Sequence, residues 1–114
     1  MGRETNRYGL IVRFDLLDGH EEAFDALTAE TVATIGAGEP GTLAYIVHTE
    51  PASPGIRVFY ELYRDEAAFD AHEEGIHVRR FLSERGQHLR RDPEVWRVKP
   101  YGGVSRAETD PESG

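Results

Sequence analysis

The spacing of the apolar residues changes at Asp18, and this change constrains the fold more than any other feature of the sequence. Residues 8–17, YGLIVRFDLL, alternate in character and are rich in β-branched and aromatic types, which predicts a strand. Beyond Asp18 the apolar positions recur at helical spacing until Gly36 and Gly38, which predicts an amphipathic helix. The residues of its buried stripe are Phe24, Leu27, Thr31 and Ile35.

Two β-rich runs follow this helix and predict an antiparallel hairpin. TLAYIVHTE (42–50) and IRVFYELYR (56–64) are separated by the short loop PASPG. A Pro/Gly loop between two such runs is typical of a hairpin. A last alternating run, EVWRVKP (94–100), predicts a fourth strand.

The region between the third and fourth strands is predicted to be helical, with one interruption. Asp65 is a favourable N-cap for the helix EAAFDAHEE, and we expect Gly75 to end that helix. Helical spacing then resumes in a second, offset helix. Its stripe consists of Val78, Phe81, Leu82, Arg85 and Leu89. The stretch HEEGIH (72–77) is therefore the joint between two helices.

The predicted order of elements is β-α-β-β-α-β. This order is typical of an α+β, ferredoxin-like fold, in which a four-stranded antiparallel sheet carries helices on one face. The domain spans residues 8–100. We expect residues 1–7 to be a mobile N-terminus and residues 101–114 to be a disordered C-terminal tail, because neither segment shows any periodicity.

The second face of the predicted sheet has no helices to cover it. By the two-residue period of a strand, this face carries Val58, Tyr60 and Leu62. Such a surface is too apolar to leave in water for a protein of this size. Two copies packed sheet to sheet would cover it, so the sequence predicts a homodimer.

Composition excludes several classes of function. The chain has a formal net charge of −8 and a pI of about 5.0, so we expect neither nucleic acid nor an anionic membrane surface as a partner. No apolar run approaches the roughly 20 residues that span a bilayer, and the start lacks the apolar core of a secretory signal. We therefore expect a cytoplasmic protein. The one basic cluster, RRFLSERGQHLRR (79–91), is interpreted as a solvated helix face, because Glu84 and apolar residues interrupt it.

HEEGIH also resembles the zinc motif H-E-x-x-H lengthened by one residue. In that motif, histidines four residues apart bind one ion from the same helix face. His72 and His77 are five residues apart, which places them about 140° apart around a helix axis. Gly75 between them is also expected to break the helix. We therefore predict no metal site.

Residues 8 to about 99 resemble the antibiotic biosynthesis monooxygenase family. The resemblance rests on EPGTLAYIVHTE, in which a Pro-Gly turn leads into the second strand, and on FYELYRDEAAFDAH. In the latter the third strand runs through Glu61 into an acidic cap, an Ala/Phe helix and His72. The resemblance implies a dimeric α/β barrel. The family includes quinol and anthrone oxygenases, haem-degrading enzymes and domains of no known chemistry.

The resemblance to the oxygenases implies a cofactor-independent monooxygenase, with O₂ as co-substrate and neither metal nor flavin. In such an enzyme a base removes a proton from a phenol or an activated methylene, and the anion passes an electron to O₂ inside a largely apolar cavity. The implied substrate is a quinol or a polyketide-like aromatic. The rival hypothesis is a non-catalytic dimeric barrel that binds a small apolar ligand.

The sequence can place one base in an aromatic pocket. Phe59, Glu61 and Tyr63 share one face of the third strand, and Phe69 and His72 lie on adjacent turns of the helix that folds back over the sheet. We predict that His72 is the catalytic base, that Glu61 orients it by accepting its hydrogen bond, and that the three aromatic residues bind substrate. The alternative is that Glu61 and His72 only satisfy each other between sheet and helix.

Other residues allow two interpretations. His48, opposite in parity to Tyr45, is either a substrate-binding residue of the same cavity or a partly exposed strand histidine. Tyr63 either donates a hydrogen bond to an oxyanion or packs in the core with its hydroxyl at the surface. Arg79 and Arg80 either attract an acidic substrate or are solvated helix residues.

The sequence departs from the best-studied members of the family. The anthrone oxygenases carry Asn and Trp on the third strand where this chain has Phe59 and Tyr63, so we do not expect their specific chemistry here. The haem-degrading branch carries Asn, Trp and His near the positions of Val12, His72 and Leu82. We therefore do not expect haem as a cofactor.

Overall fold

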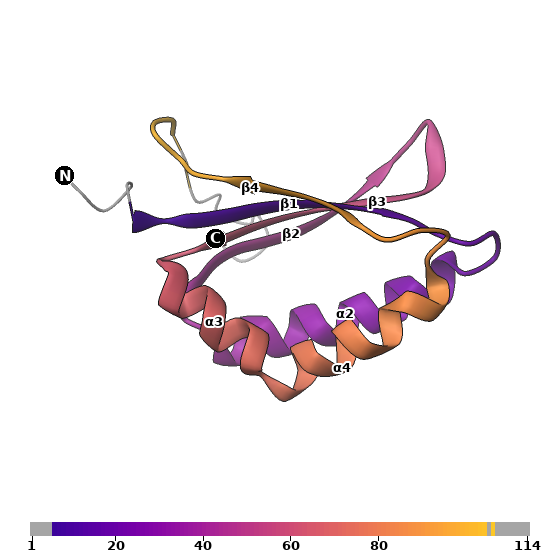
Figure 1. The fold of residues 1–114 in the computed structure, drawn as a ribbon, viewed down its shortest axis with the longest axis horizontal. Coiled ribbons are helices and arrows are strands. Elements are labelled where there is room, and N and C mark those ends of the chain that lie inside the picture. The colour runs from indigo at the N-terminus through magenta and orange to yellow at the C-terminus, as the bar shows by residue number, and fades with distance from the viewer. Residues whose placement is uncertain (1–5, 105, 107–114) are drawn as a thin grey trace, which may run out of the picture.

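The computed structural model describes residues 6–104 and 106. The chain folds into a four-stranded antiparallel sheet with its helices on one face (Figure 1). The elements in chain order are β1 (Tyr8–Asp15), α2 (Glu21–Gly38), β2 (Thr42–Glu50), β3 (Ser53–Tyr63), α3 (Glu66–Glu74), α4 (Ile76–Glu84), the 3₁₀ helix η1 (Arg85–His88) and β4 (Glu94–Val98). The strands lie in the order β2-β3-β1-β4. The predicted ferredoxin-like arrangement is confirmed.

The register of the central strands decides which side chains face the helices. In the pairing of β1 with β3, Leu10 lies opposite Glu61 and Val12 lies opposite Phe59. Directly opposed residues project from the same face of a sheet, and all four of these side chains are buried. The predicted shared face of Phe59, Glu61 and Tyr63 is therefore the helix-covered one.

Aromatic rings fill the core between the sheet and the helices. Phe14 of β1 lies 4.7 Å from Phe59 and 5.2 Å from Phe24, measured between ring centroids. Phe81 of α4 packs against the same rings. The predicted stripe of α2 is confirmed, because its four members are all buried. These contacts hold α2 and α4 against the sheet.

The break between α3 and α4 falls where HEEGIH predicts it. Asp65 caps α3 by accepting a hydrogen bond from the Ala68 backbone N–H at 2.8 Å. Gly75 then adopts φ −65° and ψ 141°, an extended conformation that ends α3 and begins α4. Because this conformation is open to any residue, the interruption does not depend on left-handed glycine geometry.

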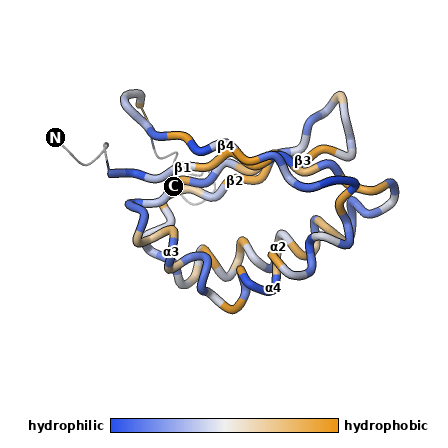
Figure 2. Tube along the Cα trace, viewed as in Figure 1, coloured by the Kyte–Doolittle hydropathy of each residue, from blue (hydrophilic) through white to orange (hydrophobic). Residues whose placement is uncertain are grey.

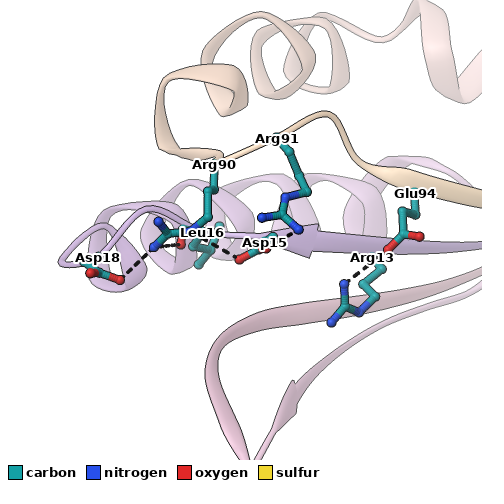
Figure 3. A network of polar contacts seen from close by, with 7 residues as sticks. All are labelled: Arg13, Asp15, Leu16, Asp18, Arg90, Arg91 and Glu94. Carbon is teal, nitrogen blue, oxygen red and sulfur yellow. Dashed lines mark hydrogen bonds and ion pairs between the residues drawn. The ribbon is translucent and has the colours of Figure 1, made fainter.

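The segment before β4 is tied to the end of β1 by arginine side chains (Figure 3). Arg90 donates to the Asp18 carboxylate at 2.8 Å, and Arg91 lies 3.3 Å from the Asp15 carboxylate. Neither arginine belongs to a helix. The interpretation of the whole stretch 79–91 as a solvated helix face is therefore wrong at this end. Here the two arginines form ion pairs that connect the segment before β4 to the end of β1.

The sheet face turned away from the helices is apolar and partly exposed. Ile46 lies opposite Tyr60, and Trp96 lies opposite Ile11, and these pairs alternate with the helix-facing residues. Ile46 and Trp96 are 50% and 47% exposed. Figure 2 shows hydrophobic stretches along the strands as well as along the helices. The predicted homodimer rests on this face and stays a prediction.

The two ends of the chain are described only in part. Of the predicted mobile N-terminus, residues 1–5 lie outside the described residues. After β4, residues 101–104 are exposed and have no regular secondary structure, whereas residues 105 and 107–114 of the predicted tail lie outside the described residues. Within the described part of the chain, no helix combines the length and the apolarity needed to cross a membrane.

Candidate active site

A cavity of about 190 Å³ lies between the helix-facing side of the sheet and the pair α3–α4. Its walls combine aliphatic, aromatic and charged side chains. The lining residues are Leu10, Val12, Tyr45, Glu61, Phe69, His72, Glu73, Val78, Leu82, Arg85, Val95 and Arg97. Larger hollows of 680, 450 and 410 Å³ lie at the surface, and His72 also lines the last of these, but Glu61 lines none of the three. The 190 Å³ cavity is therefore the candidate site.

His72 lines this cavity from α3 and is only 3% exposed. Its Nδ1 lies 2.7 Å from Oε1 of Glu39, which follows α2. The same carboxylate oxygen accepts a hydrogen bond from the Thr42 hydroxyl at 2.8 Å. Because an ionised carboxylate can only accept, Nδ1 carries the proton and Nε2 keeps its lone pair. Within the described residues Nε2 has no hydrogen-bond partner, so the ring is held in the tautomer of a base.

Glu61 lines the cavity from β3 and is held by a different residue. Its Oε1 accepts a hydrogen bond from the Tyr63 hydroxyl at 2.6 Å. Burial raises the pKa of Glu61, while the Tyr63 hydroxyl and the nearby His72 partly oppose that rise. A carboxylate with a raised pKa is a stronger base than an exposed one. The site thus holds two proton acceptors, each with its own supporting side chain.

The predicted hydrogen bond from His72 to Glu61 is wrong, as is the alternative that the two only satisfy each other. His72 is bonded to Glu39, on the turn between α2 and β2. This turn approaches α3 closely at Gly41, where a Cβ atom would lie 2.8 Å from the Ala68 Cβ. Glu39, which belongs to neither the third strand nor the helix that carries His72, thus accepts the hydrogen bond that was predicted for Glu61.

Of the four residues predicted to bind substrate, Phe69 lines the cavity. Tyr63 is fully buried and donates its hydroxyl hydrogen bond to Glu61. Its hydroxyl is therefore neither at the surface nor free to donate to an oxyanion. Phe59 is a core residue. His48 lies opposite Val58 with its Nδ1 2.9 Å from the Val58 carbonyl oxygen, and it is exposed. His48 is therefore the exposed strand histidine, outside this cavity.

Sequence reasoning missed Arg85, the most informative residue in the cavity. Its guanidinium lies over the rings of Phe14 and Phe81, at 5.4 and 5.8 Å from their centroids. Burial lowers the pKa of Arg85, although the charges of Glu61 and Glu73 oppose this. The available signal was that Arg85 occupies a position in the apolar stripe of the second helix, where an aliphatic residue is expected.

Tyr45, Glu39 and Arg97 were also missed. Burial and the charge of Glu61 raise the pKa of Tyr45 well above its ordinary value. The Arg97 guanidinium of β4 lies 4.9 Å from the Tyr8 ring centroid and 5.9 Å from that of Phe69. The alternation of β2 indicates that Tyr45 faces the helices, but nothing near Glu39 in the sequence marks it as a partner for His72.

The remaining charged candidates lie away from the cavity. His77 and Arg79 are exposed on α4, beyond the break at Gly75. Arg80 pairs with Glu30 and Glu84 at the surface. Among residues 6–104 and 106, no group of three or more His, Asp or Glu side chains is arranged to hold a metal ion.

Comparison with known proteins relates both sequence and fold to one family. The family model described as antibiotic biosynthesis monooxygenase matches residues 7–84. The structure of Rv0793 from Mycobacterium tuberculosis superposes with a TM-score of 0.80 at 24% identity, over 87% of this chain and 99% of that one. The structure of PA3566 from Pseudomonas aeruginosa superposes with a TM-score of 0.77 at 24% identity, over 89% of this chain and 100% of that one.

A further structure, named antibiotic biosynthesis monooxygenase, gives a TM-score of 0.76 at 26% identity, over 83% of this chain and 99% of that one. At such identities the superpositions establish the fold, while the family model carries the assignment to a family. No protein of curated function matches the sequence.

Proposed function

This chain belongs to the antibiotic biosynthesis monooxygenase family, and from that premise we propose that it is a cofactor-independent monooxygenase acting on a quinol or polyketide-like aromatic. The observation that carries the proposal is the buried His72, whose Nδ1 is held by Glu39 while its Nε2 has no protein partner in the described chain. This is the arrangement that a general base requires.

The first step is proton abstraction from the substrate. Nε2 of His72 takes the proton of a phenolic hydroxyl, and the Glu39 carboxylate stabilises the imidazolium that forms. Arg85 lines the same cavity and provides a positive charge near the bound substrate. The base and its orienting carboxylate therefore act together on one hydroxyl.

Oxygen then reacts with the substrate anion without an outside reductant. The anion passes one electron to O₂, and the two radicals combine to form a carbon–oxygen bond. The distal oxygen takes a proton from the imidazolium to give a hydroperoxide. Glu61, whose pKa is raised by burial, removes the hydrogen from the same carbon as the O–O bond breaks. One oxygen atom stays on the ring as a carbonyl, and the other leaves as hydroxide, which takes the proton from Glu61 to form water.

The walls of the cavity suit a reaction that must exclude bulk water. Leu10 and Val12 form the sheet side, and Val78 and Leu82 form the helix side. In such a medium a charged intermediate interacts strongly with nearby dipoles and cations, and side reactions with water are suppressed. Few side chains are then needed beyond the base and the cation.

Oxygen uptake tests the proposed function. The purified protein is mixed with a panel of quinols and anthrones in air-saturated buffer, with and without a chelator, and O₂ consumption is recorded with product analysis. We expect uptake of one O₂ per substrate, incorporation of one oxygen atom into the product, and no effect of the chelator. Uptake that depends on added metal or flavin would contradict the proposal. A complete lack of turnover across the panel would favour the non-catalytic ligand-binding barrel.

A further inference from the structure

The candidate cavity contains a cation that no carboxylate of the described chain neutralises at contact distance. Arg85 forms no ion pair or hydrogen bond with any side chain of residues 6–104 and 106, and its guanidinium lies over the ring faces of Phe14 and Phe81. Glu61 and Glu73 act on it only through space. A half-buried guanidinium that no side chain of the described residues pairs with can bind an anion supplied by a ligand.

The volume of the cavity limits the size of that ligand. A closed apolar cavity of about 150 Å³ holds one benzene molecule; this cavity is partly open, has both polar and apolar walls, and measures about 190 Å³. The difference leaves room for small substituents on one ring. Two or three fused rings exceed it. The cavity is therefore matched to a monocyclic compound, whereas anthrones have three fused rings.

The cavity carries both proton acceptors and a cation. His72 and Glu61, the two proton acceptors, come from α3 and β3, whereas Arg85 begins η1, directly after α4. The planar guanidinium presents paired N–H donors that match a carboxylate in a bidentate fashion. A ring that brings a hydroxyl to His72 can thus place a carboxylate on Arg85.

We propose that the substrate is a single-ring phenol that carries a second, anionic substituent, with the hydroxyl facing His72 and the anion paired with Arg85. The choice of a reacting phenol rests on the proposed function. The preference for an anion and the preference for one ring do not rest on the proposed function, because the first follows from Arg85 and the second from the cavity volume. Arg85 is accordingly the residue that determines specificity.

Anaerobic binding measurements test this proposal without turnover. The probes are para-hydroxybenzoate, its neutral isostere para-hydroxybenzamide, and a tricyclic anthracene carboxylate, each measured by calorimetry. We expect the first probe to bind about tenfold or more tightly than the second, because a charged hydrogen-bonded pair is lost in the amide. We also expect para-hydroxybenzoate to bind about tenfold or more tightly than the tricyclic anthracene carboxylate.

Variants assign the preference to one side chain. Arg85→Gln should abolish the preference for para-hydroxybenzoate over para-hydroxybenzamide, and Arg85→Lys should retain part of it. Arg79→Gln, which removes an exposed arginine of α4, is the matched control and should leave the preference unchanged. If Arg85→Gln does not fold, as judged by circular dichroism, the comparison of the acid with the amide on the unmodified protein still decides the charge preference.

Two results would overturn the inference. Equal affinity for the acid and the amide would remove the role of the anion, and equal or tighter binding of the tricyclic acid would remove the size limit. A persistent preference in Arg85→Gln would assign the anion to another residue and would also overturn it. Failure of oxygen uptake with the binding preference intact would count against the proposed function alone.

Discussion

At the level of single residues, His72 and His77 differ in what holds them. His72 is buried and bonded to Glu39, whereas His77 is exposed on α4. We predict that His72→Ala lowers kcat/KM by about 10²-fold or more, the usual effect of losing a positioned base. Glu39→Gln should cost less, because the amide can still contact the ring although it no longer stabilises the imidazolium. Oxygen-uptake kinetics measure both, and His77→Ala is the control. A loss in His77→Ala as large as in His72→Ala would contradict this assignment.

A second prediction at the level of single residues concerns Glu61 and the dependence of stability on pH. Burial raises its pKa above the ordinary 4.5, so the folded protein keeps this proton to higher pH than the unfolded chain does. The destabilisation is therefore absent when both states are protonated, grows as the pH rises above the ordinary carboxyl range, and becomes constant once both are ionised.

Removing the titrating carboxyl should remove this dependence. The stability of Glu61→Gln relative to the unmodified protein is expected to increase as the pH rises from about 4 to about 8, as measured by denaturant unfolding at several pH values. Glu22→Gln, at an exposed position of α2, controls for the loss of a carboxylate as such. A relative stability of Glu61→Gln that falls with rising pH would show that the pKa of Glu61 is lowered rather than raised.

At the level of elements, the position of α3 depends on the close approach of the turn at Gly41. A Cβ atom there would lie 2.8 Å from the Ala68 Cβ, so Gly41→Ala should destabilise the fold by about 1–3 kcal/mol and displace His72. Ala68→Gly alone should cost about 1 kcal/mol, as glycine does within a helix. The double variant should cost less than the sum, because the clash is then relieved.

Gly36 is the matched control for the Gly41 experiment. It lies in α2, and a Cβ atom at Gly36 would meet nothing within 4 Å. Gly36→Ala should therefore stabilise the protein by about 0.5–1 kcal/mol, since it reduces the freedom of the unfolded chain without a steric conflict. Denaturant unfolding measures all of these variants. Additive costs at Gly41 and Ala68 would show that the two positions do not touch.

At the level of the whole molecule, the apolar outer face of the sheet predicts a homodimer. Sedimentation at low micromolar concentration should give about twice the chain mass of 12.8 kDa. Ile46→Lys and Trp96→Glu place charges on that face and should shift the protein toward monomer. Ile76→Lys changes a residue that is 81% exposed on the helix side and should leave the dimer intact. A stable monomer of the unmodified chain would contradict the prediction.

The order of the elements and some of their bounds could be predicted from the sequence because their signals are local, whereas β3 begins earlier than predicted, at Ser53, and α4 ends at Glu84, so that Leu89 of the predicted stripe is not helical. The change of period at Asp18, the N-cap at Asp65 and the break at Gly75 each depend on residues within one or two turns, and the structure has them where the sequence predicts them. The face of each strand follows from alternation in the same way. These signals also placed Glu61, Phe69 and His72 on facing surfaces.

The partners of those side chains were decided by tertiary structure alone. Glu39 is 33 residues from His72 in the sequence, and only the close approach of the Gly41 turn to α3 brings the two together. Arg85 lines the cavity beside the rings of Phe14 and Phe81, which come from β1 and α4. Alternation and helical spacing specify which face a side chain occupies, but the neighbour it meets depends on how distant elements pack. The hydrogen bonds and charges of the site are therefore determined at that level.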